Sequence, residues 1–256
     1  MIVQYAAKTH CGLIRENNED NFWINGCYKA NPECKEYALC GQMPDAEFAV
    51  AVCDGMGGEE NGEIAALHAV ESMKNCGYKQ FKETAFESIR VANQKICEEI
   101  LKLDGKRSGA AIAALYIDEQ RAFGCNVGDC RIYRYFNGKL DLLSRDHTRA
   151  QSMVQMGVMT REEADRSKEK HRLTQYLGIF EHEMIIEPDY MEWQIQAGET
   201  YLLCSDGLTD MLWESEIEMI LSQKESVEEL CDELISEALG SGGKDNITVV
   251  LLRIKE

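Results

Sequence analysis

The sequence has no apolar stretch that approaches the roughly 20 consecutive residues of a membrane-spanning helix. It also has no internal repeat, no low-complexity linker, and no basic n-region followed by an apolar h-region before its first strand-like residues. These absences exclude a helical membrane protein and a repeat array, and they argue against a secretory leader. We therefore expect a soluble protein.

Basic residues are scarce. The chain of 256 residues has 27 Lys and Arg against 45 Asp and Glu, which gives a formal net charge of -18. The lysines and arginines form no cluster that would override this total. Since an acidic surface repels a phosphate backbone, the composition argues against nucleic acid as a partner.

The eleven cysteines are an odd number, and they include no CxxC pair. Without a leader, this pattern favours a reducing compartment, and we expect a cytoplasmic protein. Three cysteines within apolar runs are expected to be core residues: Cys53, Cys125 and Cys204. A zinc clip is an alternative role for three others, which lie in a polar segment: Cys27, Cys34 and Cys40.

Short β-branched or aromatic runs predict strands, and apolar residues at helical spacing predict helices. Strands are expected at 2–9, 20–25, 47–54, 109–118, 121–129, 131–138, 139–146, 183–196, 200–207 and 247–255. Helices are expected at 63–76, 81–103, 208–223 and 227–243. The tight turns within 109–146 favour an antiparallel meander, whereas 26–45 is predicted to be a loop or loose hairpin.

The grouping of strands and helices predicts an α+β fold, with sheets packed on each other and helices outside. Its motifs extend from Arg15 to Asp245, so we expect one domain over 1–256. Residues 147–178 combine helical spacing with a charged, apolar-poor stretch, and we expect them to form an exposed flap. His147 begins this flap, and a structural or hydrogen-bonding role is favoured for it. Trp23, Trp193 and Trp213 lie in or beside apolar patterns and are expected in the core.

Several apolar runs end at an aspartate next to glycine or asparagine. Asp54 and Asp206 each precede a glycine, Asp129 follows one, and Asp245 precedes Asn246. A fold that brings such chain ends to one edge creates a set of oxygen ligands suited to Mg²⁺ or Mn²⁺. Two such cations about 4 Å apart can activate a shared water for attack on phosphorus. Asp-Gly is also a common turn dipeptide, so the motifs matter as a set.

Five ordered motifs carry a resemblance to a known family. They are GLIRENNED at 12–20, DGMGG at 54–58, VGDCR at 127–131, CSDGLTD at 204–210 and GGKDNITVV at 242–250. In order and spacing they resemble the metal-dependent serine/threonine protein phosphatases of type 2C, in particular compact bacterial members. The resemblance implies a central β-sandwich of two antiparallel sheets flanked by helices.

The resemblance also implies roles for individual residues. Asp54 would bridge two metal ions, the Gly55 carbonyl would bind one of them, and Asp206 with Asp245 would complete the other. Glu19 and Asp20 would lie close by and hold metal-bound waters. Asp129, together with Asp206, matches a third and weaker metal position. Arg15 would be the phosphate clamp, because its planar guanidinium can make bidentate contacts to a phosphoryl group.

The implied reaction is direct in-line attack by the metal-bridging hydroxide on phosphoserine or phosphothreonine. It would use two Mn²⁺ or Mg²⁺ ions, with a third metal ion as an option. Asp54 and Arg15 would be the catalytic residues. Met56 occupies the position of a histidine in some relatives and cannot donate a proton, which leaves the general acid open. The expected partners are phosphoproteins and a serine/threonine kinase, and the protein is expected to be a monomer. Two alternatives stay open: a non-catalytic signalling module that binds phosphoproteins or a kinase, and a phosphatase of a small phosphomonoester.

Overall fold

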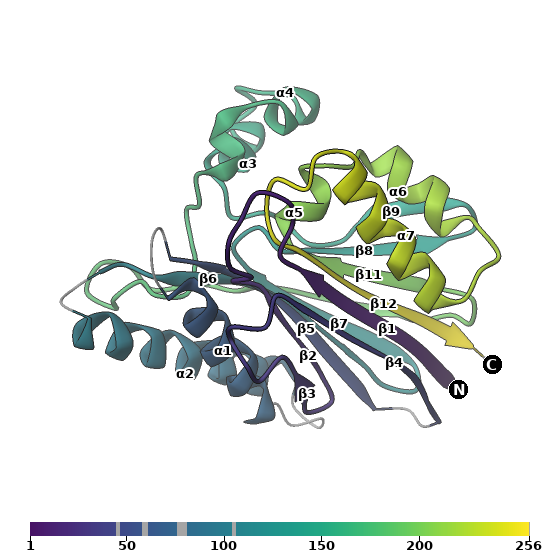
Figure 1. Ribbon diagram of the computed structural model, residues 1–256, viewed down its shortest axis with the longest axis horizontal. Helices are drawn as coiled ribbons and strands as arrows, with labels where there is room; N and C mark the ends of the chain where they lie inside the picture. Colours follow the sequence, from purple (N-terminus) through teal and green to yellow (C-terminus); the bar gives the residue numbers. More distant parts are fainter. Residues whose placement is uncertain (45–46, 58–60, 76–80, 104–105, 256) are drawn as a thin grey trace.

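The computed structural model describes residues 1–44, 47–57, 61–75, 81–103 and 106–255. Two six-stranded antiparallel sheets pack face to face, with helices on both outer faces (Figure 1). One sheet has the order β4 (Glu36–Pro44), β1 (Ile2–His10), β12 (Ile247–Lys255), β11 (Thr200–Cys204), β8 (Arg131–Phe136), β9 (Lys139–Leu142). The other has the order β10 (Asp189–Gln194), β7 (Arg121–Val127), β6 (Gly109–Ile117), β5 (Phe48–Met56), β2 (Asn21–Ile24), β3 (Cys27–Tyr28). The expected α+β sandwich is confirmed.

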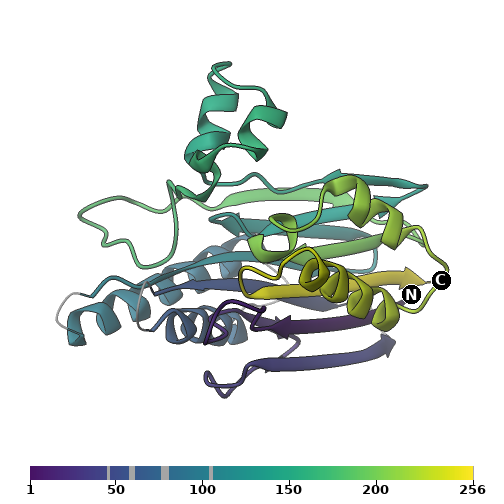
Figure 2. The same cartoon turned by 45° about the horizontal axis from the view of Figure 1, so that its top comes forward.

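The helices divide between the two outer faces and one projection. Helices α1 (Gly62–Ser72) and α2 (Phe81–Lys102), with the 3₁₀ turn η1 (Met73–Asn75), cover the sheet that contains β5. Helices α5 (Asp206–Thr209), α6 (Glu214–Leu221) and α7 (Val227–Gly240) lie on the other sheet. The short elements α3 (Arg149–Gln155), α4 (Arg161–Asp165) and η3 (Lys168–His171) project away from the sandwich within the expected flap (Figure 2). Among the described residues, no helix has the length and apolar character needed to cross a bilayer.

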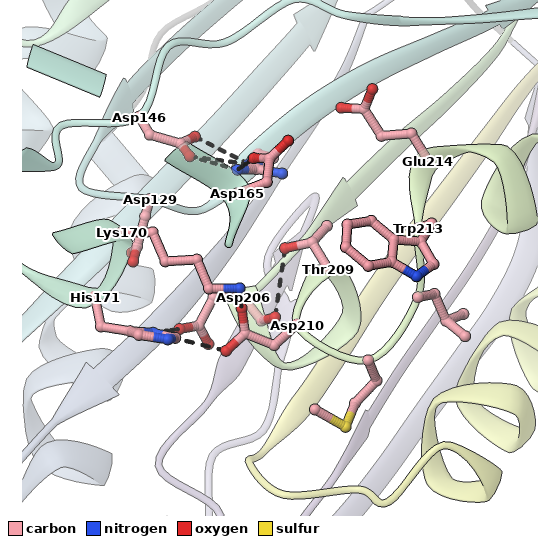
Figure 3. A pocket seen from close by; sticks show the side chains of 13 residues that line it. Asp129, Asp146, Asp165, Lys170, His171, Asp206, Thr209, Asp210, Trp213 and Glu214 are labelled. Atoms are coloured by element: carbon pink, nitrogen blue, oxygen red, sulfur yellow. Dashed lines mark hydrogen bonds and ion pairs between the residues drawn. The ribbon is translucent and has the colours of Figure 1, made fainter. Parts of the chain in front are cut away.

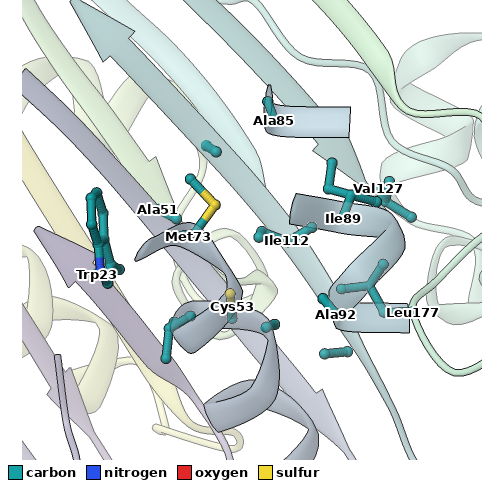
Figure 4. Packing of buried hydrophobic residues seen from close by; sticks show 14 of the residues in the cluster. Trp23, Ala51, Cys53, Met73, Ala85, Ile89, Ala92, Ile112, Val127 and Leu177 are labelled. Carbon is teal, nitrogen blue, oxygen red and sulfur yellow. The ribbon is translucent and has the colours of Figure 1, made fainter. Parts of the chain in front are cut away.

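Strands β5 and β6 are apolar along nearly their whole length because both of their faces are covered. On β5, Val50 and Val52 face the core between the sheets, whereas Ala51 and Cys53 face α1 and α2. Figure 4 shows this helix-side packing around Cys53, Met73 and Ile89. A strand that is buried on both faces loses the alternation of apolar and polar residues that marks a half-exposed strand. The cysteines expected in the core, Cys53, Cys125 and Cys204, are all buried, as predicted.

Two expectations about the chain path are wrong or incomplete. The strands of 109–146 do not form one meander: β7 belongs to one sheet and β8 to the other, so the Gly128–Cys130 turn carries the chain across the sandwich. The segment 26–45 is not simply a loop, since β4 pairs with β1 over nine residues. The alternative of a zinc clip at its three cysteines has no support among the described residues, where no cysteine belongs to a close group of side chains that could hold a metal.

The strand registers bring one end of both sheets together. Asn21 pairs with Cys53 and Ile112 pairs with Val127, so the start of β2 and the ends of β5 and β7 share an edge. In the other sheet Cys204 pairs with Val249 and His10 with Ile247, which aligns the ends of β11 and β1 with the start of β12. The loops at this end are those that contain the acidic motifs.

Candidate metal centre

Five aspartates from different loops meet at this end of the sandwich. Asp54 lies near the end of β5, Asp206 begins α5 directly after β11, and Asp129 follows β7. Asp20 precedes β2, and Asp245 precedes β12. The sequence had predicted this set as metal ligands, and the structure places all five in one site.

Electrostatic coupling among these carboxylates is strong. Burial, followed by the charges of Asp20, Asp206, Asp129 and Asp245, raises the pKa of Asp54 well above its usual value. The pKa of Asp206 is raised in the same way, first by burial and then by Asp129. Burial also raises the pKa of Asp20 to about 6 and that of Asp129 to about 7. An excess of buried negative charge is the electrostatic condition that a divalent cation relieves.

Neutral hydroxyl groups fix the Asp20 carboxylate. The side chain is 1% exposed, and its Oδ2 accepts hydrogen bonds of 2.7 Å from Ser205 Oγ and from Thr248 Oγ1. These donors come from the other sheet, so the two hydrogen bonds connect the two halves of the sandwich. Both hydrogen bonds go to the same oxygen of Asp20.

A buried lysine, which the sequence analysis did not single out, supports the same loop. Lys29 is 2% exposed, and its Nζ donates a 2.6 Å hydrogen bond to the Asn18 carbonyl. Its backbone exchanges hydrogen bonds with the Asn21 side chain, at 3.0 and 3.1 Å. Burial lowers the pKa of this lysine, and the charge of Asp20 opposes that effect. Lys29 therefore provides a positive charge behind the aspartates.

Asn246 joins two of the acidic loops. Its Oδ1 accepts a 2.7 Å hydrogen bond from Glu19 N, and its Nδ2 donates to the carbonyls of Cys11 and Asn17, both at 2.8 Å. The sequence analysis did not include this residue in the site. Because Asn246 is buried and directly follows Asp245, one side chain sets the spacing between the Glu19 loop and the start of β12.

Gly55 lies where three chain segments crowd together. A Cβ atom at this position would lie 2.2 Å from the Gly62 carbonyl oxygen and 2.5 Å from the Glu19 carbonyl oxygen. The Glu19 carboxylate in turn occupies the space where a Cβ on Gly62 would stand, 2.5 Å from Oε2. Glycine is thus required at Gly55 for close backbone approach. Of the DGMGG motif, Gly58 lies outside the described residues.

Arg15 is the cation that borders the aspartates. Its Nη2 donates a 2.7 Å hydrogen bond to Asp245 Oδ2, and the two side chains are 54% and 36% exposed. An ion pair this exposed adds little stability. Its guanidinium is therefore both placed at the site and accessible from solvent, which is what an anion-binding residue requires.

A second group of ligands adjoins Asp206. His171 Nδ1 lies 4.0 Å from Asp206 Oδ2 and 3.6 Å from Asp210 Oδ2, and these three side chains can present ligand atoms within 4.8 Å of one another. Lys170 Nζ lies 2.8 Å from the other oxygen of Asp210. Figure 3 shows His171 reaching Asp206 and Asp210 from the projecting segment. Asp210 was detectable from sequence, since it lies four residues after Asp206 on a helix, but His171 had no sequence signal.

The wall beside Asp129 is made by a buried ion pair. Arg131 contacts Asp146 through Nε at 3.1 Å and through Nη2 at 2.6 Å, and both side chains are largely buried. Arg131 Nη2 also lies 3.9 Å from Asp165 of α4. With Asp129 and Asp206, these residues line a cavity of about 130 Å³.

His147 has the structural surroundings expected of it. Its backbone N–H donates to the Gly128 carbonyl at 2.8 Å, and its Nδ1 accepts from Gly128 N at 3.3 Å. Its Nε2 lies 3.4 Å from Asp189. The imidazole therefore fixes the turn that carries Asp129 and the base of the projecting segment.

Comparisons with known proteins agree with this geometry. A family model described as "Protein phosphatase 2C" matches residues 26–246. The serine/threonine phosphatase stp of Listeria monocytogenes is 32% identical over 254 residues, covering 96% of this chain and 93% of the relative. The serine/threonine phosphatase of S. agalactiae superposes with a TM-score of 0.83 at 29% identity, over 99% of this chain and 100% of that one. The catalytic domain of PstP, solved in complex with two manganese ions, gives a TM-score of 0.80 at 28% identity, over 100% and 99% of the two chains.

Proposed function

From its membership in the protein phosphatase 2C family, which makes the chain a phosphoric monoester hydrolase, we propose how it acts. It removes phosphate from phosphoserine and phosphothreonine in protein substrates, and it uses metal ions held by the clustered aspartates. The observation that carries this proposal is the convergence of Asp54, Asp206, Asp245, Asp129 and Asp20 at one end of the sandwich. The names of the relatives support the same reaction.

The residues present fit a pair of divalent cations. The donors are carboxylate oxygens, which suit Mn²⁺ and Mg²⁺. Burial, and after it the charges of neighbouring aspartates, raises the pKa of Asp54 and of Asp206, and a bound cation would relieve both effects. In our proposal Asp54 would be a ligand of both cations, the Gly55 carbonyl would bind one of them, and Asp206 with Asp245 would complete the other. Glu19 and Asp20 would hold metal-bound waters. Bound cations would supply charge neutralisation and lower the pKa of a water at neutral pH.

Arg15 would bind the phosphoryl group of the substrate. Its guanidinium is exposed and lies against Asp245, so an incoming phosphate can be held next to the ligands. The orientation of the Asp20 carboxylate is fixed by the hydrogen bonds that its Oδ2 accepts from Ser205 and Thr248. The Met56 thioether carries no proton, so the leaving alkoxide must be protonated by another group.

Several finer features belong to the same proposal. We propose that Mg²⁺ can replace Mn²⁺, and that a third ion binds at Asp129 and Asp206. We propose that the protein acts as one domain and a monomer, on proteins phosphorylated by a partner serine/threonine kinase. No disulfide bond joins the cysteines that the structure describes, which supports a reducing, cytoplasmic location. The projecting elements at 149–171 would form the flap beside the site.

The test compares Asp54→Asn with the wild type on a phosphothreonine peptide, in Mn²⁺ and after chelation with EDTA. Asp232→Asn is the matched control, because its carboxylate is 60% exposed and its ion-pair partner among the described residues is Lys8. We expect Asp54→Asn to lose about 10³-fold in kcat/KM, since removing a shared ligand forfeits several kcal/mol of charge stabilisation. We expect the control to retain wild-type activity. Wild-type activity that persists after chelation would refute the metal mechanism.

A further inference from the structure

Trp213 is unusually exposed for its residue type. It was expected in the core, but its side chain is 58% exposed, whereas Trp23 is 4% exposed. Trp213 precedes α6, where its backbone N–H donates a 2.7 Å hydrogen bond to Glu216. An indole ring has no acceptor with which to cap a helix, so the cap does not explain why tryptophan stands there. A large exposed aromatic side chain is a common sign of a binding surface.

The indole lines the same cavity as the acidic residues. Trp213, Met211 and Thr209 form one side of the cavity that contains Asp129 and Asp206. Figure 3 shows Trp213 beside Thr209, with His171 and Lys170 on the far side of Asp206 and Asp210. Any molecule whose phosphate reaches the aspartates through this cavity therefore passes the indole.

Further exposed apolar side chains extend this surface toward Arg15. Leu13 is 62% exposed and Ile14 is 69% exposed. Leu13 N donates a 2.7 Å hydrogen bond to the Gly243 carbonyl, and the Met211 sulfur lies 3.8 Å from the Cβ position of Gly242. The Gly242–Gly243 turn thus lies between the segment that contains Leu13 and the segment that contains Met211. We call Leu13, Ile14, Met211 and Trp213 the apolar rim.

The rest of the cavity wall is acidic. Glu214 and Asp165 are 44% and 39% exposed, and they face the cavity with Asp146 and Asp210. The cations on this wall are already engaged, since Lys170 pairs with Asp210 and Arg131 pairs with Asp146. An acidic segment would be repelled from this wall, whereas an apolar or basic one would not.

We propose that the apolar rim binds an apolar side chain next to the phosphorylated residue of a protein substrate, and so determines which phosphoproteins are hydrolysed best. The proposal rests on the phosphatase function given above. Its physical basis is continuity: Leu13 and Ile14 directly precede Arg15, the proposed phosphate ligand, and Trp213 borders Asp206 through the shared cavity. Aromatic side chains at such positions contribute much of the binding energy of an interface.

The kinetic test uses two phosphothreonine peptides that differ only in having leucine or serine on either side of the phosphothreonine. We expect the wild type to prefer the leucine peptide about tenfold in kcat/KM, mainly through a lower KM. In Trp213→Ala and Leu13→Ser this ratio should fall toward one. Met219→Ser is the matched control, since Met219 is 69% exposed on α6 outside the rim, and it should keep the wild-type ratio.

A wild-type ratio near one would overturn the proposal. So would a Trp213→Ala variant in which both peptides lose activity equally and the ratio stays unchanged, because that result indicates a structural role. If no peptide is hydrolysed in Mn²⁺, the proposed function itself fails. Contact between the peptide and the apolar rim is then tested by the fluorescence titration described next.

The binding test is independent of turnover. The Asp54→Asn protein is titrated with the leucine peptide, and tryptophan fluorescence is recorded. Burial of the exposed Trp213 indole should shift the emission to shorter wavelength, and Trp213→Phe in the same background should abolish the shift. An unchanged spectrum, or a shift that Trp213→Phe retains, would refute contact with Trp213.

Light scattering tests whether a second copy of the chain, and not a substrate, covers the apolar rim. A molecular mass that doubles as the protein concentration rises in the wild type, but not in Trp213→Ala, would assign the rim to that second copy and overturn the proposal.

Discussion

Replacing Asn246 with alanine should damage the site without removing any proposed ligand. The change deletes three hydrogen bonds, to Glu19 N, to the Cys11 carbonyl and to the Asn17 carbonyl. The Asn17 side of the loop is exposed, so water can replace that partner. The Glu19 and Cys11 groups are more enclosed, and each unpaired buried group costs about 1–3 kcal/mol. With two such groups, we expect a loss of about 2–6 kcal/mol in the free energy of unfolding.

Urea unfolding in EDTA measures this loss separately from metal binding. Asn31→Ala is the matched control, because Asn31 accepts one hydrogen bond, from Glu33 N, in an exposed turn. Its loss should stay below about 1 kcal/mol. We also expect the Mn²⁺ affinity of Asn246→Ala, measured by calorimetry, to fall at least tenfold, since the Glu19 loop would no longer be fixed relative to Asp245. Equal unfolding midpoints for the two variants, or an unchanged Mn²⁺ affinity, would refute the reasoning.

Two further outcomes follow from the same structure. Gly55→Ala should lower the free energy of unfolding by about 1–3 kcal/mol, because its Cβ would collide with backbone oxygens. Gly240→Ala is the control in the same denaturation assay and should be neutral or stabilising, since no atom lies within 4 Å of its Cβ position. Equal effects of the two changes would contradict the crowding at Gly55. Burial lowers the pKa of His147, so the folded state favours the neutral imidazole. The wild type should therefore be more stable than His147→Gln above the unfolded pKa of about 6.5, and this difference in unfolding free energy should shrink as the pH falls below that value. A difference that stays constant from pH 7.5 to 5.5 would refute this.

The sequence was sufficient for most of the sandwich and for the acidic residues that meet at one end of it. Strands such as β12 and β11 are short, apolar and β-branched, and their hydrophobicity needs no tertiary context to be recognised. The motifs then indicated which strand ends carry carboxylates. Convergence itself depends on register, since Asn21 must pair with Cys53 and Cys204 with Val249 for the loops to share an edge.

The errors have a common physical origin in long-range pairing. A tight turn at Gly128 looks the same in sequence whether the next strand pairs with β7 or crosses to the other sheet. Strand β4 is an edge strand in which exposed and half-buried residues alternate irregularly, so its pairing with β1 leaves little hydrophobic signal. His171 reaches Asp206 only through the path of the projecting segment, which local periodicity does not encode.

Whether the partner of a carboxylate is charged or neutral determines how much of its negative charge is left for a metal ion. Asp20 is fixed by the hydroxyls of Ser205 and Thr248, and the Glu19 loop by the Asn246 amide. Neutral donors orient a carboxylate without cancelling its charge, whereas a buried arginine would form a closed ion pair of the kind seen at Arg131 and Asp146. At this end of the sandwich the Asp146 carboxylate is paired with the largely buried Arg131 and builds the wall, whereas the Asp20 carboxylate accepts from neutral hydroxyls and keeps its charge for a cation. Asp245 lies between these two cases, because its partner Arg15 is exposed to solvent. The difference is set by the partner and not by the acidic residue, which explains why Asp146 and Asp20 cannot be told apart by residue type and differ in the structure.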